Sequence, residues 1–340
     1  MLKPFPQIPS AKIYQGEMTP EQEVQMKLVH EQKLSDEDEA ILKESILFYK
    51  EAYTYLKSVD LVNLTENDAE KLISFLNQVF NFEFKAQNVI RFHEVYRVSF
   101  VYEEFLEKGK VRNLSFLREP PLELVQKKGV YGRANSPQRT VFYAAANPLI
   151  AILETKPKVG DRIIIGKWGH DPSKPFVTYP IMNSKVIKSP SLDKARKAFM
   201  DRLTFNHPLF AEIMDLHMEF FSSEFVKDIP VSNPKKYEYL YSAYFADNVL
   251  NNDFQPVAHP VEPLNHYDAL IYPSIAIKHQ EDNLAIMPES VKKLVPVQFL
   301  DCEVIGYDTS EVEGDRIPIQ VRLFRKSYSI ENSNIIWEDD

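Results

Sequence analysis

The first eighty residues place their apolar side chains at helical spacing. Ser35 opens one such run, and Thr65 opens another, with Asp68 three residues later as in a capping box. The stretch before them, residues 1–20, contains prolines and has no period. Residues 1–84 are therefore predicted to form a helical extension that packs on the rest of the protein or offers a surface to a partner.

From residue 88 onward the pattern changes to β-branched and aromatic residues. The stretch 88–101, NVIRFHEVYRVSFV, is typical of a strand, and a period of two puts Arg91, His93, Val95 and Arg97 on one face. The same signal predicts further strands, with boundaries near 161–168, 176–186, 268–272, 283–287, 295–307 and 317–324.

A second helical region interrupts these strands between about 190 and 250, with a break at Asn206-His207-Pro208. We interpret it as an insertion into a main domain that spans 85–328. Together the runs predict an α+β fold: a helical extension, a sheet domain and a helical insertion. The last residues, 329–340, are expected to be disordered.

The segment GRANSPQRTVFYAAANPLIAILE, residues 132–154, contains the most distinctive local pattern. A short apolar strand ends near Tyr143, and Asn147 followed by Pro148 is a typical start of a helix. That helix is short and apolar except for Glu154 at its end. A single acid that closes an apolar helix is either solvated or used chemically.

Composition and charge narrow the classes of function. A net charge of −9 argues against broad electrostatic binding to nucleic acid. The single cysteine, Cys302, excludes an internal disulfide framework, and its apolar surroundings favour a buried structural thiol. No signal-like or membrane-length apolar run occurs, so a soluble cytoplasmic protein without membrane attachment is expected.

The histidines offer little support for a metal site. His207, His217, His259 and His266 show no i,i+4 pair, and no HExxH motif occurs. No metal is therefore expected.

Three residue types in the segment 132–154 fit recognition of a nucleotide. An arginine such as Arg133 suits phosphate, a tyrosine such as Tyr143 offers a stacking face, and a carboxylate such as Glu154 can stabilise an oxocarbenium-like centre. The structural alternative stays open on these residues alone: a core tyrosine, a solvated arginine and an acid at a helix edge.

Five short blocks occur in the order that the RES domain shows. They are Tyr96-Arg97, Gly132-Arg133-Ala134-Asn135, Phe142-Tyr143-Ala144-Ala145, Glu154 and Tyr272-Pro273-Ser274. The chain resembles this family over the region 85–328. It departs from the family pattern at Ala134, where a phenylalanine is usual, which affects the geometry expected of the loop more than its chemistry.

The resemblance implies a mixed or antiparallel sheet core similar to that of ADP-ribosyltransferases, with NAD as a substrate and not a cofactor. It implies catalytic roles for Glu154, Arg97 and Ser274, and substrate binding by Arg133, Tyr143, Tyr96 and Asn135. Arg97 and Arg133 would hold the pyrophosphate or orient the ribose, Tyr143 would stack on nicotinamide, and Ser274 would fix the ribose or phosphate. It further implies a toxin whose partner is an Xre-type antitoxin protein.

The reaction expected from this resemblance is cleavage of the nicotinamide–ribose bond, with water or phosphate as acceptor. Consistently, the GxGxxG and Walker motifs that hold nucleotides as carriers are absent from the sequence. Three alternatives remain: a mono-ADP-ribosyltransferase acting on a protein, a non-catalytic module that binds a nucleotide or partner, and an unrelated metal-free hydrolase that uses Glu154 as a base. The oligomeric state is not indicated.

Overall fold

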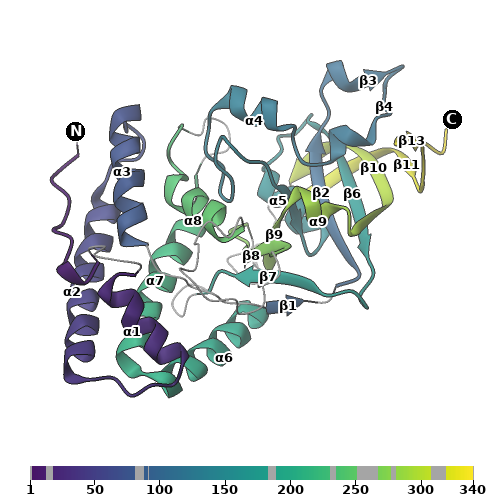
Figure 1. Cartoon of the computed structure of the whole chain (residues 1–340). Helices are drawn as coiled ribbons and strands as arrows, with labels where there is room; N and C mark the ends of the chain where they lie inside the picture. Colours follow the sequence, from purple (N-terminus) through teal and green to yellow (C-terminus); the bar gives the residue numbers. More distant parts are fainter. Residues whose placement is uncertain are drawn as a thin grey trace.

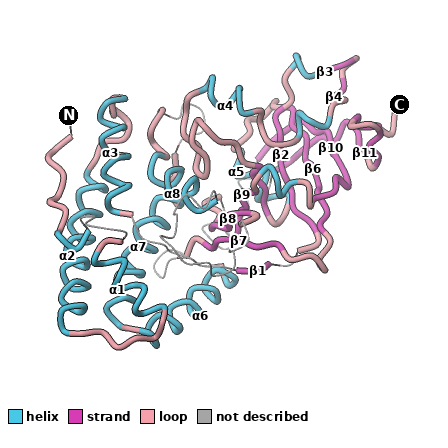
Figure 2. The backbone as a smooth tube through the Cα atoms, viewed as in Figure 1, coloured by secondary structure: helices cyan, strands magenta, loops and turns pink. Residues whose placement is uncertain are grey.

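The computed structural model describes residues 2–12, 18–80, 88–90, 92–182, 189–229, 235–250, 267–276, 281–307 and 319–339. Within them the helices are α1 (Pro20–Val29), α2 (Asp36–Ser58), α3 (Glu66–Val79), α4 (Leu122–Lys128), α5 (Pro148–Thr155), α6 (Pro190–Asn206), α7 (Pro208–Phe225), α8 (Leu240–Leu250) and α9 (Pro288–Val291). Helices gather on one side of the molecule and most strands on the other (Figure 1, Figure 2).

One large sheet organises the strand side. Its order is β1-β7-β8-β9-β5-β2-β6-β10-β11, with β7 and β8 parallel and the other neighbours antiparallel. The strands are β1 (Asn88–Ile90), β2 (Glu94–Phe100), β5 (Phe142–Ala145), β6 (Arg162–His170), β7 (Phe176–Pro180), β8 (Ala269–Pro273), β9 (Asp282–Ile286), β10 (Leu294–Tyr307) and β11 (Ile319–Ser327). The α+β prediction, with a large mixed sheet, is confirmed.

Two small hairpins complete the strands. They are formed by β3 (Leu106–Glu107) with β4 (Lys110–Val111), and by β12 (Ser329–Glu331) with β13 (Asn334–Ile336). The second hairpin corrects the prediction of a disordered tail for residues 329–339. Trp337, only 2% exposed, donates its indole N–H to the carbonyl of Val111 at 2.9 Å. A large buried aromatic ring fixes this terminus.

The predicted strand 88–101 is instead two strands in different parts of the sheet. β1 pairs with β7, whereas β2 pairs with β6 along its length. Arg91 lies outside the described residues. The aromatic and β-branched density was the correct signal for strands, but the change of partner between Ile90 and Glu94 leaves no mark in a period of two.

The N-terminal helices share a hydrophobic core with the helical insertion. Residues of α2, α3, α7 and α8 form one buried cluster. It also contains Ala134 and the sheet residues Tyr179, Tyr272 and Ala285. In Figure 1, α7 and α8 lie between α1–α3 and the strands. The extension therefore supports the insertion, and the insertion in turn packs on the strand region.

Helix starts are encoded locally, as the sequence indicated. Ser35 and Asp38 form a complete capping box at α2, through hydrogen bonds of 2.9 and 3.2 Å between side chains and backbone N–H groups. Thr65 accepts from the Asp68 N–H at the start of α3. Asn147 caps α5 by accepting from the Ile150 N–H at 2.9 Å, with Pro148 at the first helical position.

Candidate functional site

The large sheet splits between β2 and β5. These neighbours share a single residue pair, Tyr96 with Ala145, whereas β2 and β6 pair from Glu94 to Phe100. A pocket of about 380 Å³ lies at the split. Because β2 and β5 separate, side chains from both strands reach the same cavity. Its volume is typical of sites that bind small molecules.

Glu154 is the most strongly held side chain in the pocket. Its Oε1 accepts four hydrogen bonds, from the Ser274 hydroxyl at 2.5 Å, the Asn283 amide at 2.9 Å, and the N–H groups of Ile275 at 3.0 Å and Ala276 at 3.4 Å. No described residue donates to the other oxygen, Oε2. Glu154 lines the pocket, so this carboxylate is fixed at one oxygen, and no described residue binds the other.

The segment that follows β8 holds both ends of α5. Ser274 to Ala276 bind Glu154 in the last turn, and Glu281 accepts from the side-chain amide of the N-cap residue Asn147 at 2.6 Å. Ser274 also donates its backbone N–H to the Glu281 carbonyl at 2.8 Å. Hydrogen bonds thus hold helix α5 at both of its ends, and they fix the position of Glu154.

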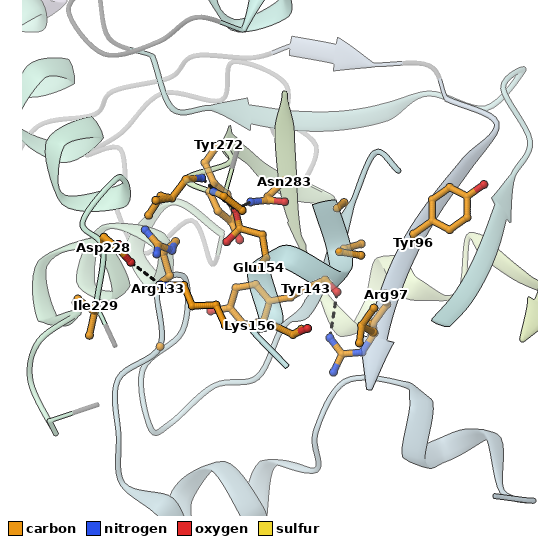
Figure 3. Close-up of a pocket in the computed structure, with 18 of the residues that line it drawn as sticks. Tyr96, Arg97, Arg133, Tyr143, Glu154, Lys156, Asp228, Ile229, Tyr272 and Asn283 are labelled. Carbon is orange, nitrogen blue, oxygen red and sulfur yellow. Dashed lines mark hydrogen bonds and ion pairs between the residues drawn. The ribbon is translucent and has the colours of Figure 1, made fainter. Parts of the chain in front are cut away.

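Arg97 projects from β2 beside the split. Its Nη1 donates to the Tyr143 carbonyl of β5 at 3.0 Å, and its guanidinium carbon lies 5.0 Å from the centre of the Phe142 ring (Figure 3). Its Nε is buried without a hydrogen-bond partner, and it forms no ion pair with a described residue, although the charge of Glu119 acts on it from beyond that distance. Burial lowers the pKa of Arg97 to about 10. A desolvated cation that lines a cavity and forms no ion pair with a described residue is suited to bind an anion.

Tyr143 and the preceding loop lock each other. The Tyr143 hydroxyl donates to Asn135 Oδ1 and accepts from the Ala134 N–H, both at 2.8 Å. Gly132 and Asn135 pair across the tight turn between them, and a Cβ on Gly132 would lie 2.4 Å from Asn135 Oδ1. Burial raises the pKa of Tyr143, so the phenol stays neutral. Ala134 is itself fully buried, and the loop is ordered without the usual phenylalanine.

Arg133 contacts the helical insertion. Its Nη1 donates to the Phe225 carbonyl, and its Nη2 donates to the Lys227 carbonyl and the Tyr239 hydroxyl, each at 3.1 Å. Phe225 is the last residue of α7, so the guanidinium satisfies carbonyls at a helix end that intrahelical bonds leave open. Arg133 therefore connects the loop to the insertion as well as lining the pocket.

The structure brings all seven sequence-predicted site residues into one region. Five of them line the pocket, namely Tyr96, Arg97, Arg133, Tyr143 and Glu154. Asn135 and Ser274 are buried behind it and reach it through Tyr143 and Glu154. The prediction that Ser274 itself faces the cleft is wrong.

Tyr96 stands apart from the other predicted residues. In Figure 3 its ring lies at the far side of the pocket from Glu154. Its hydroxyl donates to Glu94, which also pairs with Lys167, and burial raises the pKa of Tyr96. A hydroxyl already engaged with a carboxylate leaves the ring as the part that can contact a ligand.

Sequence reasoning missed several residues of the pocket. Asn283 stands directly against Glu154, and the cavity is also lined by Lys156, Asp228, Ile229, Tyr239 and Tyr272. Lys156 and Asp228 form an ion pair of 2.5 Å across the pocket (Figure 3). Tyr239 lies just before α8 and stands among several other tyrosines in the sequence. Only its tertiary contact with Arg133 distinguishes it.

Other kinds of site find no support in the described residues. No group of three or more His, Cys, Asp or Glu side chains that could hold a metal occurs in that part of the chain. His259 and His266 lie outside it. None of the helices within the described ranges is long and apolar enough to cross a membrane.

A comparison with protein families matches the RES domain to residues 118–304, more than half of the chain. The chain belongs to the RES domain family. No curated protein and no solved structure matches it.

The RES domain match contains most of the pocket but not all of it. Glu154, its donors, the Gly132–Asn135 turn and the helical insertion fall within 118–304, whereas Tyr96 and Arg97 precede that range. Strand β2 is nevertheless paired with β6, which the match includes. The RES domain pocket of this protein is therefore completed by a strand that lies before the matched residues.

Proposed function

We propose that this RES domain protein cleaves the bond between nicotinamide and ribose in NAD. The observation that carries the proposal is the state of Glu154, whose Oε1 is held by four donors while Oε2 receives none from the described residues. It lies at the wall of a pocket that is also lined by Arg97, which forms no ion pair with a described residue. The split mixed sheet is compatible with the ADP-ribosyltransferase-like fold that the family resemblance implies.

The proposed reaction breaks the C–N bond between ribose C1′ and the pyridinium nitrogen. The bonding pair leaves with nicotinamide, which becomes neutral, and positive charge develops on the ribose. Glu154 stabilises this oxocarbenium-like centre and accepts a hydrogen bond from a ribose hydroxyl through Oε2. Its donors are in place before the reaction, so the carboxylate needs no reorganisation as charge develops.

Arg97 is the residue best suited to the pyrophosphate of NAD. It is buried beside the pocket with no ion-pair partner among the described residues, so an anion that enters the pocket would compensate its charge. Tyr143, whose hydroxyl is fixed by Asn135 and Ala134, presents its ring as a rigid face for a flat base.

The residue at position 152 favours a small acceptor. Many arginine-specific ADP-ribosyltransferases carry a second glutamate two residues before the catalytic one, and this chain has Ile152 there, buried in an apolar cluster. Without that second carboxylate, attack by water or phosphate is favoured over modification of a protein arginine. The product would be ADP-ribose or its 1-phosphate.

The test is release of free nicotinamide from NAD by the purified full chain, with and without phosphate. Glu154→Gln preserves shape and removes the charge, and it should lower kcat by about 100-fold or more. Equal release by wild type and Glu154→Gln would disprove the mechanism. No release by wild type would disprove the function and favour a binding module. ADP-ribose bound to added protein would identify a transferase.

The same proposal has a cellular consequence. An enzyme that consumes NAD should arrest growth when it is induced, and Glu154→Gln should relieve the arrest. We also propose that an Xre-type antitoxin restrains the native protein, in keeping with the family resemblance. Co-expression with a candidate antitoxin should then restore growth without changing the amount of the toxin.

A further inference from the structure

The helical insertion contributes a wall of the pocket. Asp228 and Ile229, which follow α7, and Tyr239, which precedes α8, all line the cavity with Glu154 and Tyr143. They lie 74 to 85 positions after Glu154 in the sequence. The site is therefore incomplete without this region, which we call the insertion wall: residues 225–229 together with Tyr239.

Arg133 is the main polar link between the Gly132–Asn135 turn and the insertion wall. It donates to two carbonyls of the wall, those of Phe225 and Lys227, and to the Tyr239 hydroxyl. Its guanidinium carbon also lies 5.0 Å from the centre of the Tyr239 ring. These bonds use three of the five N–H donors, including both on Nη2, so the paired donors that would bind a phosphate through Nη2 and a neighbouring nitrogen are already taken.

Other contacts reinforce the same connection. Tyr131, just before the turn, donates its N–H to the Lys236 carbonyl at 3.0 Å, and its ring contacts that of Tyr237. Lys156, the residue that follows α5, pairs with Asp228 of the same wall at 2.5 Å. The wall is thus held from both the turn and the end of α5, with Arg133 at the centre.

We propose that Tyr239 contacts the substrate and helps to determine its specificity, and that Arg133 is a positioning residue for the insertion wall and not the pyrophosphate ligand. The inference rests on the proposed NAD cleavage. Tyr239 supplies a second aromatic face, besides Tyr143, for the flat nicotinamide ring, and Ile229 adds apolar surface beside it. Phosphate recognition then falls to Arg97, which forms no ion pair with a described residue and feels the charge of Glu119 only beyond ion-pair distance.

Backbone hydrogen exchange of the full chain tests the positioning role without relying on activity. Arg133→Ala should accelerate exchange of the amides of residues 225–229 by about tenfold or more, because local opening becomes easier when the carbonyls lose their donors. Arg97→Ala is the matched control: it removes the other arginine that lines the same pocket and should leave these amides unchanged. Unchanged exchange in Arg133→Ala would overturn the positioning role.

A double-mutant cycle tests the contact between Tyr239 and the substrate. Tyr239→Leu keeps apolar volume but removes the flat ring, and Tyr239→Phe keeps the ring. We expect Arg133→Ala and Tyr239→Leu each to raise KM for NAD about tenfold with little change in kcat, and the double variant to be little worse than either. Tyr239→Phe should stay within about threefold of wild type.

Three results would overturn the inference. If the two effects multiply to about a hundredfold, Arg133 binds the substrate independently of Tyr239. If Tyr239→Phe is as damaging as Tyr239→Leu, the ring is not what the substrate contacts. If Tyr239→Leu leaves KM unchanged, the wall does not touch the substrate. Absence of nicotinamide release from wild type instead disproves the proposed function, while the exchange experiment still decides the role of Arg133.

Discussion

Two clusters in this protein bury charged side chains, and they differ in how completely those charges are paired. In the helical bundle, Lys12 and Glu21 are both fully buried and form an ion pair of 2.6 Å. In the pocket, Arg97 and Glu154 are each held at some atoms, while Arg97 Nε and Glu154 Oε2 form no hydrogen bond or ion pair with a described residue. Burial lowers the pKa of both Lys12 and Arg97, so both cations are desolvated.

The bundle cluster is closed by its own residues. Lys12 donates to the Tyr49 hydroxyl and to the Val79 carbonyl, and Tyr49 donates to Glu21 at 2.9 Å. These contacts tie the N-terminal segment to α1, α2 and α3. The comparison suggests that burial of a charge does not mark a functional site. A charge left open toward a cavity does so better, since the missing partner can be a ligand.

The largest effect is expected when the buried ion pair of the bundle cluster is broken. Lys12→Met leaves Glu21 buried without its counter-ion and should reduce the free energy of unfolding by about 3–5 kcal/mol. Urea denaturation measures it. The kcat of the folded fraction for nicotinamide release should not change, because Lys12 lies outside the pocket.

The double variant Lys12→Met/Glu21→Met tests whether the loss of stability comes from leaving Glu21 unpaired. Replacement of both charges by apolar side chains should recover most of the lost stability. If Lys12→Met costs less than about 1 kcal/mol, or lowers kcat as Glu154→Gln does, the division between a structural and a functional cluster is wrong.

A smaller effect is expected in the open cluster, at Asn283. Asn283→Ala removes one of the four donors to Glu154 Oε1 and should lower kcat about tenfold, whereas the isosteric Asn283→Asp should lower it about a hundredfold because two carboxylates then face each other. Initial rates of nicotinamide release at saturating NAD measure both.

Asn248→Asp is the control for that comparison. Asn248 also donates its amide at 2.8 Å, but to the Tyr244 carbonyl in α8, away from the pocket. The change should leave kcat near wild type. If Asn283→Asp retains more activity than Asn283→Ala, the amide does not serve to hold an ionised Glu154.

Local structure was largely predictable from the sequence. The caps at Ser35, Thr65 and Asn147, and the helix break before Pro208, depend on neighbouring residues and are read directly from the chain. The division of 88–101 into β1 and β2 was not predictable, because it depends on β7 and β6, which lie far along the chain. The prediction of a disordered tail was wrong for a similar reason, because Trp337 is fixed by a hydrogen bond to the distant residue Val111.

The site was predictable only as far as the RES motif blocks extend. They identified Glu154 and the arginines, but not that Ser274 lies behind Glu154 or that Arg133 faces the end of α7. Asn283 and Tyr239 carry no local signal. Asn283 resembles any strand residue, and Tyr239 any core aromatic near a helix, until the fold brings them against Glu154 and Arg133.

The smallest expected effect is a change in how the stability of the bundle cluster depends on pH. His217 of α7 is buried against the bundle cluster, where Tyr53 shares a hydrogen bond with its Nδ1 and the Tyr49 ring lies 4.3 Å away. Burial, and secondarily the charge of Lys12, lower the pKa of His217 well below its usual value. As pH falls below about 6.5, His217 therefore binds a proton in the unfolded chain but not in the folded chain.

The free energy of unfolding should therefore be unaffected by His217 above about pH 7 and should fall at lower pH, by up to about 1.4 kcal/mol per pH unit. His217→Gln keeps a polar side chain beside Tyr53 but cannot titrate, so it should remove this part of the slope. Urea midpoints of the two proteins at pH 7 and pH 5.5 measure the difference, because contributions from all other groups cancel. Equal slopes would mean that His217 is protonated in the folded bundle, and the cluster around Lys12 would then be open to a proton.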